Sequence, residues 1–367
     1  MSTDELLSRE VAGAASVPHG CPPCDQPDVV TIGNDRWSLD VLPGTGASLG
    51  AGRIRTPDGV WRDLLRPTPQ TATGNPERCA SFLMLPWSNR IDQGRLTFGG
   101  QTWQLQRTGA DGTAIHGATR HAQWTITSHD PDQVTLELVS SEQVGINFPW
   151  QFRAAVTYRL DGSVLRVTTV LRNTDVEPFP AGFGHHPYFR RALLPVGSAG
   201  DPQAQPMLEI PAGSGYPLAR GIATGSAAAI PARADYRVAR PVGSAFVDDV
   251  LTGFVVEASG NATEARDASG ADTGALATFD AEGCTAARIT YPAVDHPGVV
   301  VDLRTDDAYG HLVVYVPRRR GYFAVEPVTH VNGGLALHQA GVEGTGVVIL
   351  EPGQEQRATF TISVTTS

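Results

Sequence analysis

Five short segments of this sequence place polar or ionisable residues where a β scaffold would otherwise have apolar ones. Between them the segments supply a guanidinium group, imidazoles and carboxylates, which can transfer protons or hydrogen-bond hydroxyl groups. The segments are Leu85-Pro86-Trp87-Ser88-Asn89-Arg90-Ile91, Ile115-His116-Gly117, Gly182-Phe183-Gly184-His185-His186-Pro187-Tyr188-Phe189, Phe246-Val247-Asp248-Asp249 and Tyr322-Phe323-Ala324-Val325-Glu326-Pro327-Val328-Thr329-His330.

Glu326 and His186 are the strongest candidates for acid/base chemistry. Glu326 follows four largely apolar residues and precedes a proline, which predicts a half-buried carboxylate at the inner end of a strand. Burial raises the pKa of a carboxyl group and suits it to act as a general base. His186 lies in a rigid turn bracketed by glycine and proline, beside two aromatic residues, although a structural role for this histidine stays open.

Arg90, His116 and Asp248 are candidate ligands for hydroxyl groups. An arginine fork at the end of an apolar run can donate to two hydroxyls or to a carboxylate. His116 precedes a glycine, which suggests a side chain at a strand end with another backbone close by. From the local pattern alone a surface arginine, a satisfied structural histidine and solvated acids remain the alternatives.

Metal ligation is the less favoured use of the histidines and cysteines. The adjacent His185 and His186 would point to opposite sides of a strand, whereas two ligands on one strand are separated by one residue. Cys21-Pro22-Pro23-Cys24 resembles half of a zinc site, but Cys79 and Cys284 lie far off in the sequence and are not paired with each other. We therefore predict neither a structural nor a catalytic metal.

The residue pattern predicts an all-β scaffold for these groups. Alternating residues in 152–171, interrupted by Asp161-Gly162, predict a hairpin, and shorter β-rich runs recur at 37–42, 95–105, 134–139, 298–303, 311–316, 346–350 and 358–364. We find neither a long apolar stripe of helical period nor a dinucleotide-binding glycine motif. We expect a poorly ordered extension at 1–28, one domain at 29–367, and long surface loops at 195–245 and 258–278.

Composition narrows the classes of partner and chemistry. The 367 residues carry a net charge of −10, and all 28 basic residues are arginine. The charge argues against nucleic acid, and the absence of lysine excludes Schiff-base chemistry and a phosphate-loop lysine. The N-terminal residues are acidic where a signal peptide would be basic, and no apolar run approaches the roughly 18 residues of a membrane span. We expect a cytoplasmic protein without membrane partners.

In this order, the five segments resemble those of the aldose 1-epimerase family, also called galactose mutarotases. The matching residues are Asn89-Arg90, His116-Gly117, His186-Pro187-Tyr188-Phe189, Asp248 and Glu326-Pro327. The resemblance runs from about residue 30 to the end of the sequence. It implies one large antiparallel β-sandwich with an open sugar-binding cleft and no need for a cofactor.

The resemblance also implies a role for each residue. Glu326 would be the general base that takes the proton from the anomeric hydroxyl, and His186 the acid that protonates the ring oxygen. Arg90, His116 and Asp248 would hold the sugar hydroxyls, with Asn89 beside them, and His116 would also polarise the ring oxygen or the developing aldehyde. The ring would open, rotate about C1–C2 and reclose as the other anomer.

Three departures from the family pattern affect these expectations. Val331-Asn332-Gly333-Gly334 replaces the usual run after Glu326-Pro327, which leaves the sugar preference open. The double acid Asp248-Asp249 leaves a choice, and we choose Asp248; the additional His185 is expected to be structural.

Three other functions remain as alternatives. A hexose-6-phosphate 1-epimerase could grip phosphate through Arg318-Arg319-Arg320 or Arg190-Arg191. A non-catalytic sugar-binding module would bind the sugar without turnover. A glycosidase or lyase would use Asp248 and Glu326 as paired carboxylates, which their separation would reveal. The oligomeric state is expected to be monomer or homodimer.

Overall fold

The computed structural model describes residues 26–198, 204–254, 283–294 and 296–366. These residues form strands joined by turns, with a single α-helix among them, α1 (Gly334–Gln339). Every strand pair in the described residues is antiparallel. The predicted all-β, antiparallel fold is confirmed.

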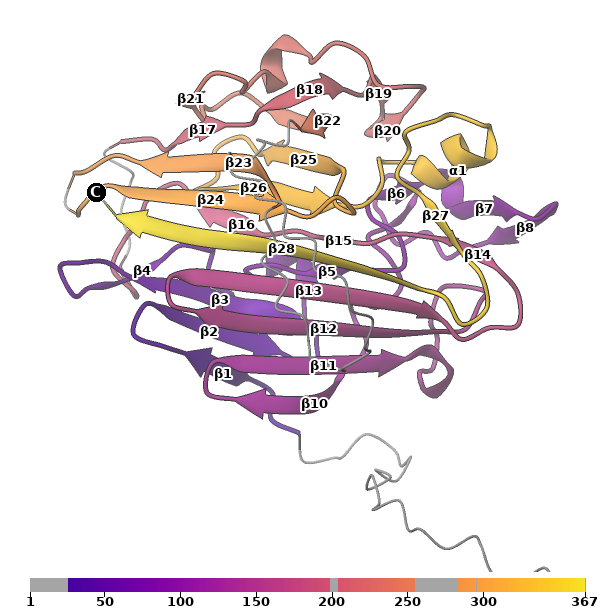
Figure 1. Cartoon of the computed structure of the whole chain (residues 1–367), viewed down its shortest axis with the longest axis horizontal. Coiled ribbons are helices and arrows are strands. Elements are labelled where there is room, and N and C mark those ends of the chain that lie inside the picture. The colour runs from indigo at the N-terminus through magenta and orange to yellow at the C-terminus, as the bar shows by residue number, and fades with distance from the viewer. Residues whose placement is uncertain (1–25, 199–203, 255–282, 295, 367) are drawn as a thin grey trace, which may run out of the picture.

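The largest sheet has nine strands and forms one layer of the molecule (Figure 1). Its strands, in spatial order, are β10 (Thr125–Asp130), β11 (Gln133–Val139), β12 (Phe152–Asp161), β13 (Val164–Asn173), β28 (Glu355–Thr366), β24 (Val299–Thr305), β23 (Cys284–Tyr291), β17 (Met207–Glu209) and β21 (Arg240–Pro241). The predicted hairpin is β12 and β13, which pair along ten positions around a turn in which Gly162 has a φ of 54°. Buried and more exposed residues alternate along β12, so one face of this sheet packs into the core.

A seven-stranded sheet carries the candidate chemistry. It contains β18 (Ala212–Gly215), β22 (Val247–Phe254), β25 (His311–Val316), β26 (Tyr322–Val328), β15 (Gly184–His185) and β5 (Leu83–Met84), and β16 (Tyr188–Arg190) also pairs with β26. Six of the seven residues of β26 are buried. Both faces of this strand are therefore covered, one by the core and one by the residues of the cleft described below.

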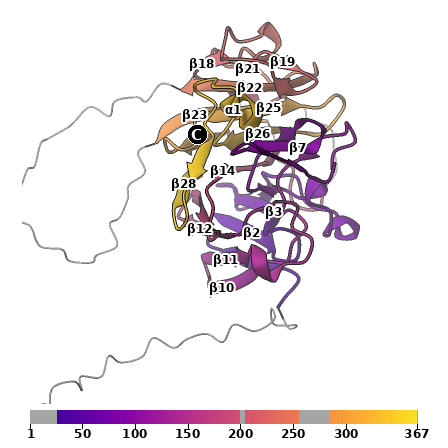
Figure 2. The ribbon, with the colours of Figure 1, turned by 90° about the vertical axis from the view of Figure 1, so that its right-hand side faces the viewer.

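Five smaller sheets accompany these two in the described residues. Figure 2 shows one of them, the four-stranded sheet, across from β11 and β12 of the nine-stranded sheet. The four-stranded sheet contains β1 (Val30–Gly33), β2 (Trp37–Leu42), β3 (Ser48–Arg55) and β4 (Trp61–Asp63). The two-stranded pairs are β6 (Arg90–Ile91) with β9 (Ala114–Ile115), β7 (Arg95–Phe98) with β8 (Gln101–Gln104), β14 (Phe179–Ala181) with β27 (Val348–Leu350), and β19 (Leu218–Ala219) with β20 (Ile222–Ala223). The short 3-10 helices are η1 (Gln70–Ala72), η2 (Pro76–Arg78), η3 (Asp92–Gly94), η4 (Ser140–Glu142) and η5 (Ala232–Ala234).

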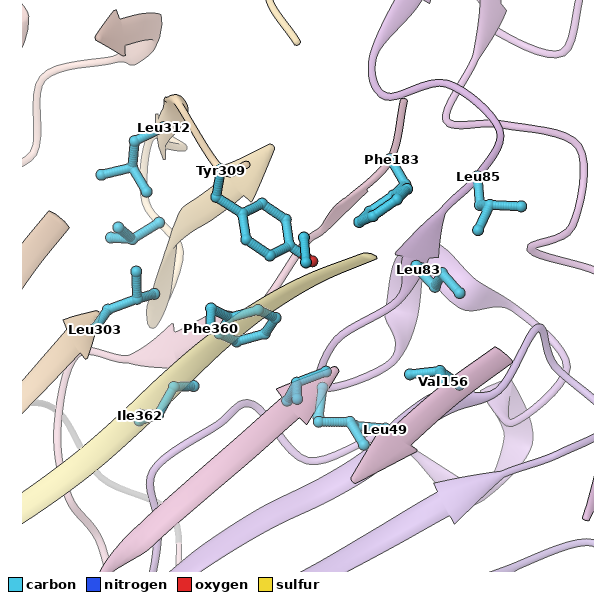
Figure 3. Packing of buried hydrophobic residues seen from close by; sticks show 14 of the residues in the cluster. Leu49, Leu83, Leu85, Val156, Phe183, Leu303, Tyr309, Leu312, Phe360 and Ile362 are labelled. Atoms are coloured by element: carbon cyan, nitrogen blue, oxygen red, sulfur yellow. The ribbon is translucent and has the colours of Figure 1, made fainter. Parts of the chain in front are cut away.

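The main hydrophobic core lies between these sheets. Val156 of β12 and Phe360 of β28 belong to the same buried cluster as Leu83 of β5 and Leu312 of β25, and Figure 3 shows them converging with Phe183. Burying each such side chain contributes roughly 1.5–3 kcal/mol. The core therefore holds the seven-stranded sheet, with its polar residues, against a rigid partner.

Two predicted irregular regions differ from what the structure shows. The segment 195–245, expected to be a surface loop, contains β17 to β21 and η5 in its described part, because short bridges use its few β-forming residues. The loop expected at 258–278, Cys21 and Cys24 lie outside the described residues, as does most of the predicted extension. Gln26, which we had assigned to that extension, already hydrogen-bonds the backbone of Trp124 and Ile126.

Candidate active site

A cleft of about 330 Å³ lies on the face of the seven-stranded sheet that points away from the main core. The strand register explains why its polar residues share one face. Glu326 of β26 is opposite Val313 of β25, and Asp248 of β22 is opposite Tyr315 of β25. Because Val313 and Tyr315 are two residues apart on one strand, they and their partners point to the same side of the sheet. The described lining residues are Glu77, Phe82, Asn89, Arg90, Ile115, His116, His186, Tyr188, Asp248, Val313, Tyr315, Tyr322 and Glu326. All six candidate site residues named from the sequence are among them.

Glu326 and His186 form a direct pair in this cleft. Oε1 of Glu326 lies 3.0 Å from Nε2 of His186, and only 2% and 7% of the two side chains are exposed. Glycines bring the two segments together, because a Cβ at Gly184 would lie 2.5 Å from a methyl group of Val328 on β26. Oε2 of Glu326 and Nδ1 of His186 make no hydrogen bond to any described residue.

Opposing influences act on the Glu326 carboxyl. Burial raises its pKa, while the adjacent His186 works in the opposite direction. Asp248 adds to the upward shift and Arg90 opposes it. The result is a carboxyl group with a pKa above its ordinary value, in contact with an imidazole to which it can pass a proton.

The segments that carry Arg90 and His116 are joined to each other by backbone contacts. Arg90 pairs with Ile115 between β6 and β9, and the amide of His116 donates to the carbonyl of Asn89 at 2.9 Å. His116 has a φ of 60°, and at the following Gly117 a Cβ would lie 2.3 Å from the carbonyl oxygen of Leu85. The glycine of the His-Gly pair is therefore required for the close approach that puts His116 into the cleft.

His116 is an uncharged imidazole near neutral pH. Burial lowers its pKa well below the ordinary value, and His186, Arg120 and Arg90 add to the shift. Its ring meets that of His186 edge-on, with the centroids 5.7 Å apart, and its Nδ1 lies 2.9 Å from Sδ of Met84. His116 can therefore hydrogen-bond a ligand but cannot supply a positive charge to it.

Arg90 connects several polar groups at one side of the cleft. Its Nε donates to Asp111 at 2.9 Å, its Nη1 donates to Oδ1 of Asn89 at 3.3 Å, and its Nη2 lies 3.9 Å from Asp248. The Nδ2 of buried Asn89 has no partner among the described residues, so it remains available as a donor to a ligand. Sequence reasoning missed Asp111, which follows no apolar run and gives no local signal.

The structure distinguishes the two adjacent acids on β22. Asp248 lines the cleft, and burial raises its pKa while Arg90 opposes the rise. Asp249 points to the other face of the strand, where Arg233 donates to its two oxygens at 2.6 and 2.8 Å. Strand alternation thus leaves Asp248 free to meet a ligand and gives Asp249 a structural ion pair.

Neighbouring histidines and aromatic residues support the pair. His185, next to His186, points away from the cleft and shares a 2.8 Å hydrogen bond with Thr169. Phe82 and Tyr188 contact the His186 ring, with centroids 4.7 and 4.3 Å away. Sequence reasoning missed Phe82, and it missed Tyr315 and Tyr322 as lining residues, because they look like ordinary strand residues.

The departure Val331-Asn332-Gly333-Gly334 lies beside a neighbouring cleft. Buried Asn332 donates to the carbonyl of Gly221 at 3.2 Å, which fastens the turn between β19 and β20. Gly333 lines a second cleft of about 340 Å³, which shares only Arg90 with the first among the described residues. This loop therefore does not line the cleft that holds Glu326 and His186.

Two further features concern metals and membranes. Within the described ranges, no group of three or more histidine, cysteine or acidic side chains is arranged to hold a metal ion. The same part of the chain contains no helix long and apolar enough to cross a bilayer.

The fold and the cleft together define an antiparallel β-sandwich protein with a buried carboxyl–imidazole pair. Residues 28–363 match the family model described as aldose 1-epimerase. The chain therefore belongs to the aldose 1-epimerase family, as its sequence segments suggested.

Two Escherichia coli K12 proteins are similar to part of the chain: YphB at 32% identity over 36% of this chain and 44% of YphB, and YihR at 30% identity over 31% of this chain and 37% of YihR. Both are described as uncharacterized, and the chain spans less than half of the length of either.

Solved structures show the same fold. A putative aldose 1-epimerase from Escherichia coli K12 superposes with a TM-score of 0.69 at 19% identity, covering 92% of this chain and 99% of its own. A galactose mutarotase-like protein from Clostridium acetobutylicum gives 0.74 at 17% identity, covering 92% and 95%. A galactose 1-epimerase from Lactobacillus acidophilus gives 0.63 at 16% identity, covering 92% and 94%.

Proposed function

We propose that this protein interconverts the α and β anomers of a free aldose, with Glu326 as general base and His186 as general acid. The observation that carries the proposal is the buried pair with its 3.0 Å contact, facing a cleft whose other polar groups suit hydroxyls. A cleft of about 330 Å³ falls within the usual range of small-ligand sites, roughly 300–1,000 Å³.

The reaction needs one proton removed and one delivered. Glu326 accepts the proton of the anomeric hydroxyl as the bond between C1 and the ring oxygen breaks, and His186 gives its proton to that oxygen. Rotation about C1–C2 turns the aldehyde, and reclosure returns both protons. Each such acid or base contributes on the order of 10²–10⁴-fold.

The remaining residues fix the orientation of the sugar in the cleft. Arg90 and Asn89 donate to hydroxyl oxygens, and Asp248 accepts from a hydroxyl. If Nδ1 of His116 donates its proton toward Met84, its Nε2 is an acceptor, so His116 would receive a hydrogen bond from a hydroxyl. This refines the expectation that His116 polarises the ring oxygen, for which a donor would be needed.

The geometry favours a free sugar over the alternatives. Among the described lining residues, Arg90 is the one arginine, and it is already paired with Asp111. Arg190 and Arg191 are not among these residues, and Arg318, Arg319 and Arg320 are exposed outside the lining. The pairing of Glu326 with an imidazole supports proton shuttling over a two-carboxylate glycosidase mechanism, and the presence of both groups supports turnover over binding alone.

Optical rotation provides the direct test. Freshly dissolved α-D-glucose and α-D-galactose should approach anomeric equilibrium faster with the wild-type protein, in weakly catalytic buffer near pH 7. Glu326→Gln should abolish the acceleration, and Glu142→Gln, at an exposed glutamate outside the cleft, should retain it. Acceleration of hexose 6-phosphates alone would support the phosphate-specific alternative, and no acceleration of any aldose would contradict the proposal.

A further inference from the structure

Glu77 is a cleft residue that neither the sequence segments nor the proton-transfer mechanism uses. It lies in η2, where its backbone amide donates to Oδ1 of the capping Asn75 at 3.1 Å. Its carbonyl oxygen accepts from Nη2 of Arg66 at 2.7 Å. The backbone that carries the Glu77 carboxylate is therefore fixed on both sides.

Arg120 fixes one end of the Glu77 side chain. Nη1 of Arg120 donates to Oε1 of Glu77 at 2.9 Å, and the arginine side chain is 6% exposed while that of Glu77 is 57% exposed. Arg120 follows His116 by four residues, so the segment that brings the imidazole also brings this guanidinium. No hydrogen bond among the described residues reaches Oε2 of Glu77, which leaves an oriented acceptor at the open side of the cleft.

The carboxyl groups at the cleft outnumber the arginines that bind them. Glu77, Asp248 and Glu326 line the cleft and Asp111 adjoins it, whereas only Arg120, bound to Glu77, and Arg90, bound to Asp111, balance them among the described residues. A neutral polyol offers hydroxyl donors to carboxylate oxygens, whereas an anionic ligand is repelled by them. Exposure and salt weaken that repulsion but do not change its sign.

We propose that Glu77, positioned by Arg120, determines specificity at this site by accepting a hydrogen bond from a sugar hydroxyl and disfavouring sugars that carry a carboxylate or phosphate. The inference rests on the proposed function and narrows its substrates to neutral aldoses. It also gives the Arg120–Glu77 pair a role in selecting ligands as well as in holding the cleft together.

The test compares Glu77→Gln with the wild type on D-glucose and D-glucuronate, at low and high ionic strength. Glutamine keeps an acceptor for Arg120 but loses the charge. We expect KM for glucose to rise about tenfold with kcat unchanged, since a hydrogen bond to a charged group is lost. The preference for glucose over glucuronate in kcat/KM should fall about tenfold at low salt, and by less at high salt.

Two further variants separate charge from geometry. Glu142→Gln removes the same charge outside the cleft and should leave both quantities unchanged. Glu77→Asp keeps the charge but shortens the side chain, so it should weaken glucose binding while retaining discrimination against glucuronate. The proposal is overturned if Glu77→Gln behaves as Glu142→Gln does, or if it alters both sugars equally.

Calorimetric titration of the two sugars gives a readout that does not depend on turnover. If the wild-type protein fails to accelerate the mutarotation of any aldose, the proposed function fails. Titration of glucose into the wild type and Glu77→Gln then still tests Glu77, with about tenfold weaker binding expected in the variant. Equal glucose affinities would overturn the role of Glu77 separately.

Discussion

Glu326 illustrates how the role proposed for a residue in catalysis can oppose its contribution to folding. Its carboxyl is buried, and the raised pKa means that the folded environment disfavours the charged form. His186, at 3.0 Å, partly offsets this by favouring charge. A carboxylate in a well-solvated position would lack this raised affinity for protons and would be a weaker base.

Replacement of Glu326 by glutamine should remove activity. The free energy of unfolding of this variant should also increase relative to that of the wild type as pH rises. A carboxyl whose pKa is raised on folding contributes stability that is present at low pH and is lost as pH rises through the folded pKa. The uncharged glutamine has no such loss. Urea unfolding of both proteins at pH 5 and pH 8 should show Glu326→Gln gaining on the wild type at pH 8. A difference in unfolding free energy that is the same at both pH values would contradict this account.

Replacement of His116 by asparagine should separate binding from fold. Asparagine tolerates the left-handed conformation that His116 adopts, so the backbone should be kept. The shorter amide cannot reach the same hydroxyl, and kcat/KM for glucose should fall by about 10- to 100-fold. Polarimetry and thermal unfolding, with exposed His121→Asn as control, check this; a loss of Tm of more than a few degrees would indicate a structural role instead.

At the scale of an element, β22 divides two roles between two consecutive acids. Asp248 faces the cleft and Arg90, while Asp249 is buried and bound by Arg233. The two carboxyls differ in environment because alternate residues of a strand point to opposite faces. A shift of one residue in the pairing of β22 with β25 would exchange them.

The pair Asp248→Asn and Asp249→Asn should therefore give opposite results. Asp249→Asn should lower the unfolding free energy by about 1–3 kcal/mol, less than a fully buried ion pair because Arg233 is half-exposed, and should leave KM unchanged. Asp248→Asn should raise KM for glucose with little loss of stability. Denaturant unfolding and polarimetry on both variants decide the matter; a raised KM in Asp249→Asn alone would reverse the assignment.

A site residue could be predicted from the sequence only where its type differed from the pattern of its neighbours. Glu326, Arg90 and Asp248 end or interrupt apolar runs and His186 lies in a turn bracketed by glycine and proline, so the sequence indicated all four. The alternation of residues indicated the β12–β13 hairpin. Glu77 and Asp111 lie in polar surroundings and reach the cleft through contacts with residues distant in sequence. Phe82 and Tyr315 could not be recognised as lining residues, because an aromatic residue of a strand has the same sequence pattern whether it faces the core or a ligand.

At the scale of the whole molecule, buried neutral histidines link stability to pH. Burial lowers the pKa of His185 to about 3 and those of His311 and His330 to about 4. Neutral His311 can donate to one of the two backbone carbonyls beside its ring, that of Thr329 or that of Gly344, and His330 accepts from the amide of Ser88 at 3.0 Å. All three are within the sandwich, so they titrate normally only when it unfolds.

Acid should therefore unfold this protein over a predictable range. Below the ordinary histidine pKa of 6.5 and above the folded values, the unfolded chain binds more protons, so stability falls with falling pH. Each histidine contributes about 1.4 kcal/mol per pH unit within that range. Urea midpoints measured from pH 7 to pH 4.5 should fall steadily, and less steeply in His185→Gln; midpoints that do not change below pH 6.5 would contradict the assignment.

The position of β28 has a consequence for synthesis of the protein in the cell. This strand lies between β13 and β24 in the middle of the nine-stranded sheet, yet it follows every other strand of the described residues in the sequence. While the ribosome is still translating residues 355–366, β13 and β24 expose unpaired edges to other chains. Those edges stay open to pairing with other chains, unless chaperones cover them, until residues 355–366 are inserted between them.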